Sequence, residues 1–122
     1  MTFNEYQAKA STTAMYLNKI KELNPDLPDD VLSILGLSYA SLGLGESGEV
    51  QGKVKKIIRD SGGVITEEAK KEISKELGDI LWYVSAVCGE LGIEMDQVAE
   101  QNIEKLFSRK ERGVITGNGD NR

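Results

Sequence analysis

Apolar residues recur three and four positions apart along four stretches of the chain, which is the spacing of amphipathic α-helices. No Asn-Gly or Asp-Gly turn lies between alternating apolar segments, so nothing indicates a β-hairpin. We therefore expect an all-α protein with the architecture of a four-helix-type bundle. The predicted helices span approximately residues 4–23, 29–59, 67–91 and 95–112.

Residues that start and stop helices flank these stretches. Asn24-Pro25-Asp26-Leu27-Pro28 ends the first, and Ser61-Gly62-Gly63 ends the second, which we expect to be interrupted near Gly36 or Gly43. Thr66 is the expected N-cap of the third stretch and Gly92 its C-terminal stop. The glycine-rich, polar tail after the fourth stretch has the composition of a frayed end.

Length and charge set the outer bounds. The 122 residues suit a single domain, 1–122, and the net charge of -5 disfavours nonspecific binding to duplex nucleic acid. The one cysteine, Cys88, lies in an apolar stretch and is expected to be a small buried hydrophobe in a reducing compartment. No leader-like N-terminus or apolar run of about 18 residues is present. We expect a cytoplasmic protein with no membrane partner.

Two short motifs, G-E-S-G-E-V and K-E-L-G-D-I, place acids inside apolar helix faces. At about 100° per residue, Glu46 and Glu49 share a face with apolar neighbours, and Glu76 and Asp79 do the same on the third stretch. The apolar neighbours are Leu42, Val50 and Ile57 for the first pair, and Ile73, Ile80, Tyr83 and Val87 for the second. Four acids beside a core would repel one another unless a cation lay among them.

The residues available decide which cation fits. The chain has no histidine and one cysteine, so a zinc site or a ferritin-like di-iron site lacks its ligands. Carboxylate oxygens suit Mg²⁺, with Mn²⁺ as the alternative. The remaining helical glutamates are expected to form an ordinary solvated surface; these are Glu67, Glu68, Glu72, Glu90 and Glu94.

Polar donors follow one face of the fourth stretch. Viewed along the helix axis, Lys105 and Arg109 lie within about 60° of Asn102, and Arg112 lies within about 80° of it. They are either a binding stripe or ordinary snorkelling side chains. Lys53 also has two interpretations. It either contributes charge to the binding site or complements the helix dipole, as basic residues toward a helix C-terminus do.

Glycines interrupt the helix that carries the first acidic pair. Gly45, Gly48 and Gly52 share a face, at a cost of about 1 kcal/mol each relative to alanine. This cost predicts close approach by either another helix or a ligand.

The two acidic motifs, with 26 residues between Glu49 and Glu76, resemble the Glu-x-x-Glu … Glu-x-x-Asp signature of MazG-like nucleotide pyrophosphohydrolases. This family belongs to the all-α NTP pyrophosphatase superfamily. The segments N-I-E-K-L-F-S-R-K-E-R-G and G-N-G-D-N-R are similar to the family's C-terminal pattern, and F-N-E-Y-Q is similar to its first helix. The resemblance extends from about Leu35 to Arg122.

The resemblance implies hydrolysis of nucleoside triphosphates between the α and β phosphates, giving a nucleoside monophosphate and pyrophosphate. It implies a homodimer or homotetramer whose sites use helices from partner chains. The implied Mg²⁺ ligands are Glu46, Glu49, Glu76 and Asp79. The implied phosphate contacts are Asn102, Lys105, Arg109 and Arg112, with Lys53 as a further candidate.

Two roles are our own hypotheses beside that resemblance. Glu49 is our candidate for accepting the proton of the attacking water. In the tail, Gly117 and Gly119 would let the backbone approach phosphates while Asp120 and Arg122 close the site, on the same subunit or a neighbouring one.

Two alternatives remain open at this level. One is a non-catalytic helical interaction module, in which the acids are only exposed charge. The other is a related phosphohydrolase that acts on dUTP or on phosphoribosyl-ATP. The sequence does not identify the base, because the aromatic candidates for stacking fit the core or a subunit interface equally well. These candidates are Tyr6, Tyr39, Trp82 and Tyr83.

Overall fold

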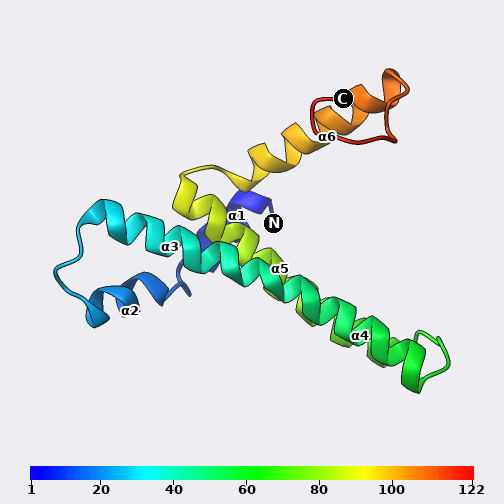
Figure 1. The fold of residues 1–122 in the computed structure, drawn as a ribbon, viewed down its shortest axis with the longest axis horizontal. Helices are drawn as coiled ribbons and strands as arrows, with labels where there is room; N and C mark the ends of the chain where they lie inside the picture. The colour runs from blue at the N-terminus through cyan, green and yellow to red at the C-terminus, as the bar shows by residue number, and fades with distance from the viewer.

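The computed structural model describes residues 1–122 and contains helices and no strands, which confirms the all-α prediction (Figure 1). The four predicted stretches are all helical, although the first two are each divided. The elements are α1 (Phe3–Ser11), α2 (Tyr16–Leu23), α3 (Asp29–Gly43), the 3₁₀ turn η1 (Leu44–Glu46), α4 (Ser47–Asp60), α5 (Glu67–Leu91) and α6 (Met95–Glu111).

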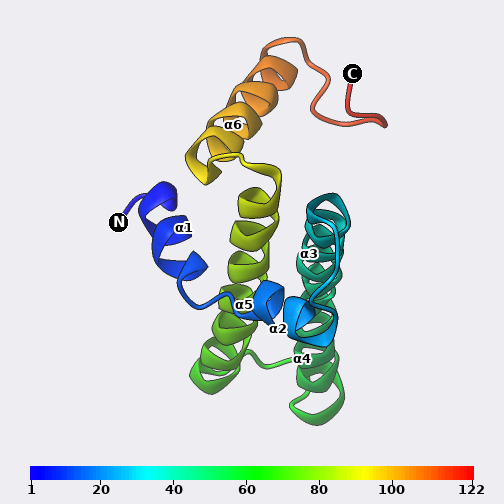
Figure 2. The same ribbon diagram turned by 90° about the vertical axis from the view of Figure 1, so that its left-hand side faces the viewer.

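The long helix α5 is the centre of the fold. α3, η1 and α4 follow one another as a nearly continuous rod that packs along α5, while α1 packs on α5 and α2 packs on α3 (Figures 1 and 2). Both predicted ends of α5 are confirmed. The Thr66 side chain accepts a hydrogen bond from the Ala69 amide at 3.1 Å, and Gly92 ends the helix with a φ of 66°.

The prediction of one helix over residues 4–23 is wrong. The chain leaves the helix after Ser11 and resumes at Tyr16. Three consecutive hydroxyl side chains, those of Ser11, Thr12 and Thr13, donate to the carbonyls three residues earlier at 2.7–2.8 Å. Such local bonds compete with helix continuation, so this run of hydroxyls ends α1 where the apolar spacing alone predicted continuity.

The predicted interruption near Gly43 is confirmed, since the 3₁₀ turn η1 begins directly after it. Gly43 also allows close packing. A Cβ at this position would lie 2.0 Å from Cδ1 of Tyr83 on α5, so only glycine fits here without displacing the ring. This contact fixes how the rod sits on α5 at the level of the acidic residues.

Little of the chain is buried. Seven of 122 residues are buried, among them the apolar residues Tyr16, Ala40, Cys88 and Met95, and the expectation of a buried Cys88 is confirmed. The accessible surface is 8849 Å², whereas a compact monomer of this mass exposes about 6,500 Å². The excess is therefore about 2,300 Å².

The helix α6 accounts for part of this openness. It packs on α1 but runs away from the hairpin of α4 and α5, as both views show (Figures 1 and 2). A four-helix bundle is thus not closed within one chain. No helix of the structure has both the length and the apolar character that a bilayer crossing requires.

Candidate functional site

Two of the four predicted metal ligands line one cavity. Glu46, at the end of η1, and Asp79, on α5, border a cavity of about 410 Å³ together with Thr13, Trp82 and Tyr83. Burial is the main cause that raises the pKa of Tyr83, and the neighbouring Tyr39, Glu46 and Asp79 raise it further. The phenol of Tyr83 therefore stays protonated beside the two carboxylates.

Tyr6 of α1 is also affected by the negative charge of Asp79. Its pKa is raised by burial first and by the charge of Asp79 second. The first helix thus approaches Asp79, a neighbour that the sequence resemblance did not assign to the acidic site.

The other two predicted ligands stand apart from this pair. The carboxylate of Glu76 lies 3.4 Å from the Lys53 ammonium, which is also 3.7 Å from Glu72. Glu49 is exposed on α4. As the side chains lie, no three Asp, Glu, Cys or His residues converge in an arrangement that could hold a metal ion. The expected convergence of four acids is therefore realised for Glu46 and Asp79 alone.

The residue types nevertheless suit a hard divalent cation. All four acids lie on η1, α4 or α5. Both η1 and α4 pack on α5. Lys53 already places a positive charge against Glu76 and Glu72. The Lys53 ammonium neutralises part of the negative charge of these carboxylates, as a bound cation would also do.

The predicted phosphate donors on α6 do not meet the acids in this chain. Asn102 and Lys105 are exposed, and α6 leads away from the α4–α5 hairpin (Figure 2). Arg109 is buried, and its guanidinium donates to the backbone carbonyl of Asp120 at 2.7 Å while its Nε has no partner. Arg112 donates to the Arg122 carbonyl at 2.9 Å.

The tail folds against the end of α6 instead of extending away from it. Arg122 donates to the backbone carbonyls of Val114, Ile115 and Gly119, at 3.2, 3.2 and 2.5 Å. The composition of the tail is that of a frayed end, but in the structure the Arg122 guanidinium holds the tail backbone through these three carbonyls. In this arrangement Arg122 contacts the tail's own backbone, and the tail lies at the far end of α6 from the acids (Figure 1).

Gly45 of η1 and Gly48 and Gly52 of α4 have no close packing partner within the chain. A Cβ placed on Gly45, Gly48 or Gly52 would have no neighbouring atom within 4 Å. The close approach that these glycines predicted is therefore not made by another helix of the same chain. A face of this kind is open to a ligand or to a second subunit.

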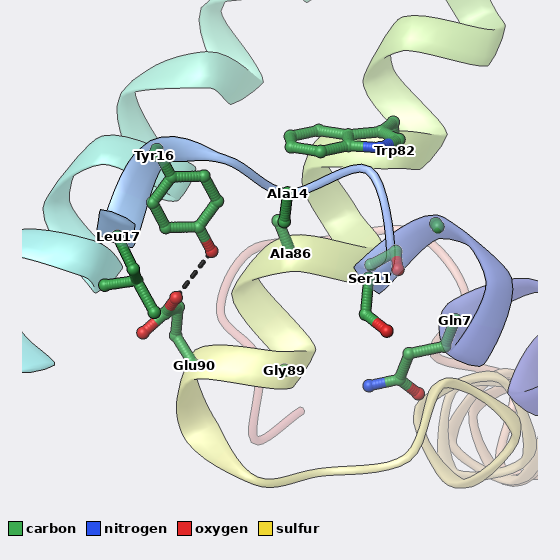
Figure 3. A pocket seen from close by; sticks show the side chains of 11 residues that line it. Gln7, Ser11, Ala14, Tyr16, Leu17, Trp82, Ala86, Gly89 and Glu90 are labelled. Carbon is green, nitrogen blue, oxygen red and sulfur yellow. Dashed lines mark hydrogen bonds between the residues drawn. The ribbon is translucent and has the colours of Figure 1, made fainter. Parts of the chain in front are cut away.

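A second cavity, which the sequence analysis did not identify, adjoins the acidic one. It has a volume of about 270 Å³ and lies between α1, the α1–α2 turn and α5 (Figure 3). Trp82 lines both cavities, and its indole N–H donates to Thr13 at 2.8 Å. At the other side of the second cavity, the Tyr16 hydroxyl donates to Glu90 at 2.5 Å.

The expectation that Glu90 belongs to a solvated surface is therefore wrong. The residue is half-buried and bonded to Tyr16, which is itself buried. The helical spacing contained a signal for this, because Glu90 lies four residues after Ala86 and seven after Tyr83, on the same face of α5.

Comparison with known proteins identifies the family of the chain. A model of the MazG nucleotide pyrophosphohydrolase domain matches residues 36–114, a range that contains the four acids and all four predicted donors from Asn102 to Arg112. The chain is also 48% identical over 118 residues to the Gene 37 protein of Mycobacterium phage L5, covering 96% of each chain. No solved structure matches significantly. The chain therefore belongs to the MazG nucleotide pyrophosphohydrolase family.

Proposed function

We propose that this protein is a Mg²⁺-dependent nucleoside triphosphate pyrophosphohydrolase that cleaves between the α and β phosphates. The observation that carries the proposal is the open acidic cavity of Glu46 and Asp79, two acids that both lie in the region that matches the MazG domain. The products would be a nucleoside monophosphate and pyrophosphate.

In this proposal the metal is held by Glu46, Glu49, Glu76 and Asp79, with Mn²⁺ as a substitute. When bound, the metal neutralises phosphate charge and lowers the pKa of a coordinated water. For Glu76 to join the site, the Lys53 ammonium must exchange one anionic partner for another. A substrate phosphate is that partner, which gives Lys53 a role in binding. Glu49, which is exposed on α4, would accept the proton of the attacking water.

We further propose that the enzyme is a homo-oligomer in which α6 of a second copy completes the site. The excess surface of about 2,300 Å² per chain is typical of the large interfaces of obligate oligomers. A second copy would bring the donors that α6 carries away from its own acids. These donors are Asn102, Lys105, Arg109 and Arg112, with Asp120 and Arg122 in the attached tail.

The test is a panel of canonical and modified nucleoside triphosphates incubated with Mg²⁺, with pyrophosphate and inorganic phosphate measured separately. We expect pyrophosphate and the monophosphate as products, and loss of activity on chelation. Release of inorganic phosphate alone would contradict the proposed bond cleavage. Absence of any hydrolysis, with or without Mg²⁺, would favour the helical interaction module instead.

A further inference from the structure

The acidic cavity and the cavity next to it share one wall. Trp82 borders both, and Thr13, which accepts the indole N–H, lines the acidic side. A nucleotide likewise has two parts, an anionic phosphate chain and a largely apolar base. The second cavity, at about 270 Å³, is slightly smaller than the range of roughly 300–1,000 Å³ for complete small-molecule sites. It therefore suits one part of such a ligand.

The walls of this second cavity are largely apolar and aromatic. Ala10, Ala14, Leu17 and Ala86 make it apolar. Trp82 and Tyr16, whose ring centroids lie 6.4 Å apart, border it together with Glu90 (Figure 3). The rings of Tyr16 and Tyr83 meet the indole nearly at right angles, at 80° and 86°. Neither ring stacks parallel on Trp82, so a planar ligand in this cavity would be the first parallel stacking partner of the indole.

Glu90 is the charged group in this cavity. One carboxylate oxygen, Oε1, accepts the hydrogen bond of the Tyr16 hydroxyl, and the other, Oε2, lies on the side of Gly36 of α3. Gly36 creates the room for it, since a Cβ there would lie 2.7 Å from Oε2. The carboxylate is thus oriented by a buried tyrosine and still has an acceptor atom to offer.

The direction of the Tyr16–Glu90 hydrogen bond follows from the chemistry of the pair. Burial raises the pKa of Tyr16 far above its usual value, and the hydrogen bond to Glu90 and that residue's charge raise it further. Tyr16 therefore remains a donor at neutral pH, and its hydroxyl donates to Glu90. The Glu90 carboxylate can therefore accept a hydrogen bond from a ligand that fills the cavity.

We infer that this cavity receives the base of the nucleotide and that Glu90 selects bases with an exocyclic amino group. Cytosine, adenine and guanine each present such a donor, and carboxylates accept from the cytosine amino group in other protein sites. In uracil and thymine the ring N–H is flanked by two carbonyl oxygens, which a carboxylate repels. The inference rests on the proposed function for the identity of the ligand as a nucleotide.

Binding can be measured without hydrolysis, because Trp82 is the only tryptophan in the chain. We would titrate the full-length protein, with Mg²⁺, against non-hydrolysable analogues of dCTP and dUTP and of dATP and dITP. The members of each pair differ by an amino group against a carbonyl. A hydrogen bond to a charged group corresponds to a preference of about tenfold to 100-fold. We expect the amino member of at least one pair to bind tighter by that factor, with a change in tryptophan emission.

The decisive variant is Glu90→Gln. The amide oxygen can still accept from Tyr16, while the amide nitrogen now presents a donor to the base. We expect the preference to fall to near unity or to reverse in favour of the carbonyl member. Glu100→Gln, the same change at an exposed residue of α6, should leave the ratio as in the wild type. Tyr16→Phe keeps the carboxylate and should retain the preference.

The outcomes separate the inference from the proposed function. Equal affinity within both pairs in the wild type, an unchanged ratio in Glu90→Gln, or no change in Trp82 emission at saturation would each overturn the inference. If hydrolysis then still occurred, the proposed function would stand. Selective binding without any hydrolysis would instead support the base site and remove the proposed activity.

Discussion

Replacing Gly43 by alanine tests the packing that positions the acidic cavity. The new methyl carbon would lie 2.0 and 2.1 Å from Cδ1 and Cε1 of Tyr83, well inside van der Waals contact. Since Tyr83 packs edge-on against Trp82 with ring centroids 5.0 Å apart, the ring cannot move without disturbing that neighbour. Overpacking of this kind costs about 1–3 kcal/mol.

A second glycine provides the matched control. Alanine in place of a helical glycine gains about 0.5–1 kcal/mol from backbone entropy, and this gain applies to Gly43 as well. At Gly78 on α5 a Cβ would meet no atom within 4 Å, so Gly78→Ala should show the gain alone. The difference between the two variants then isolates the steric cost, and it should be about 1–3 kcal/mol in favour of Gly78→Ala.

The assay is urea denaturation followed by circular dichroism, at one protein concentration for all variants. A double-mutant cycle with Tyr83→Ala sharpens it, because Gly43→Ala should cost nothing once the ring is absent. If Gly43→Ala proved as stable as Gly78→Ala, the packing of the rod on α5 described above would be wrong. Because Tyr83 lines the cavity of Glu46 and Asp79, we also expect Gly43→Ala to lower Mg²⁺-dependent hydrolysis.

Three further predictions follow from individual contacts. Asp79→Asn should weaken Mg²⁺-dependent hydrolysis by at least about tenfold with little change in the thermal midpoint measured without metal; full activity would remove Asp79 from the metal site. Because the pKa of Tyr16 is raised in the folded state, stability should hold below the unfolded value of about 10 and fall as the pH rises above it. Urea titrations at pH 8 and 11 should show a smaller loss in Tyr16→Phe, and equal losses would contradict this. Thr66→Ala should cost about 1 kcal/mol by removing the cap of α5, whereas Thr66→Ser should cost nothing measurable in the same titration.

The sequence predicted well the features that depend on local chemistry. The cap at Thr66 and the stop at Gly92 depend on side chains and backbone angles within one turn, and both lie where predicted. The break after Ser11 was missed because the apolar spacing continues through it, although the hydroxyl run that causes it is visible in the sequence. Periodicity records which face of a helix is apolar but not whether the backbone leaves the helix.

The site was predicted only in part, for a different reason. The spacing of Glu46 and Asp79 placed both acids toward one interface, and they do line one cavity. Helical phase does not fix the rotamer of a long side chain, so the pairing of Glu76 with Lys53 could not be foreseen. The direction of α6 was also beyond reach, because an amphipathic face does not specify which helix, or which copy of the chain, will cover it.

The small number of buried residues has a calorimetric consequence. A typical domain of 122 residues unfolds with a heat-capacity change of about 1.5–1.8 kcal/mol/K, because it exposes apolar surface that the native state had hidden from water. This chain already exposes about 2,300 Å² more than a compact monomer would, so it has correspondingly less surface left to hydrate when it melts alone. A measured heat-capacity change near that of a typical domain would therefore indicate that the native molecules bury, in solution, surface that a single copy exposes to water.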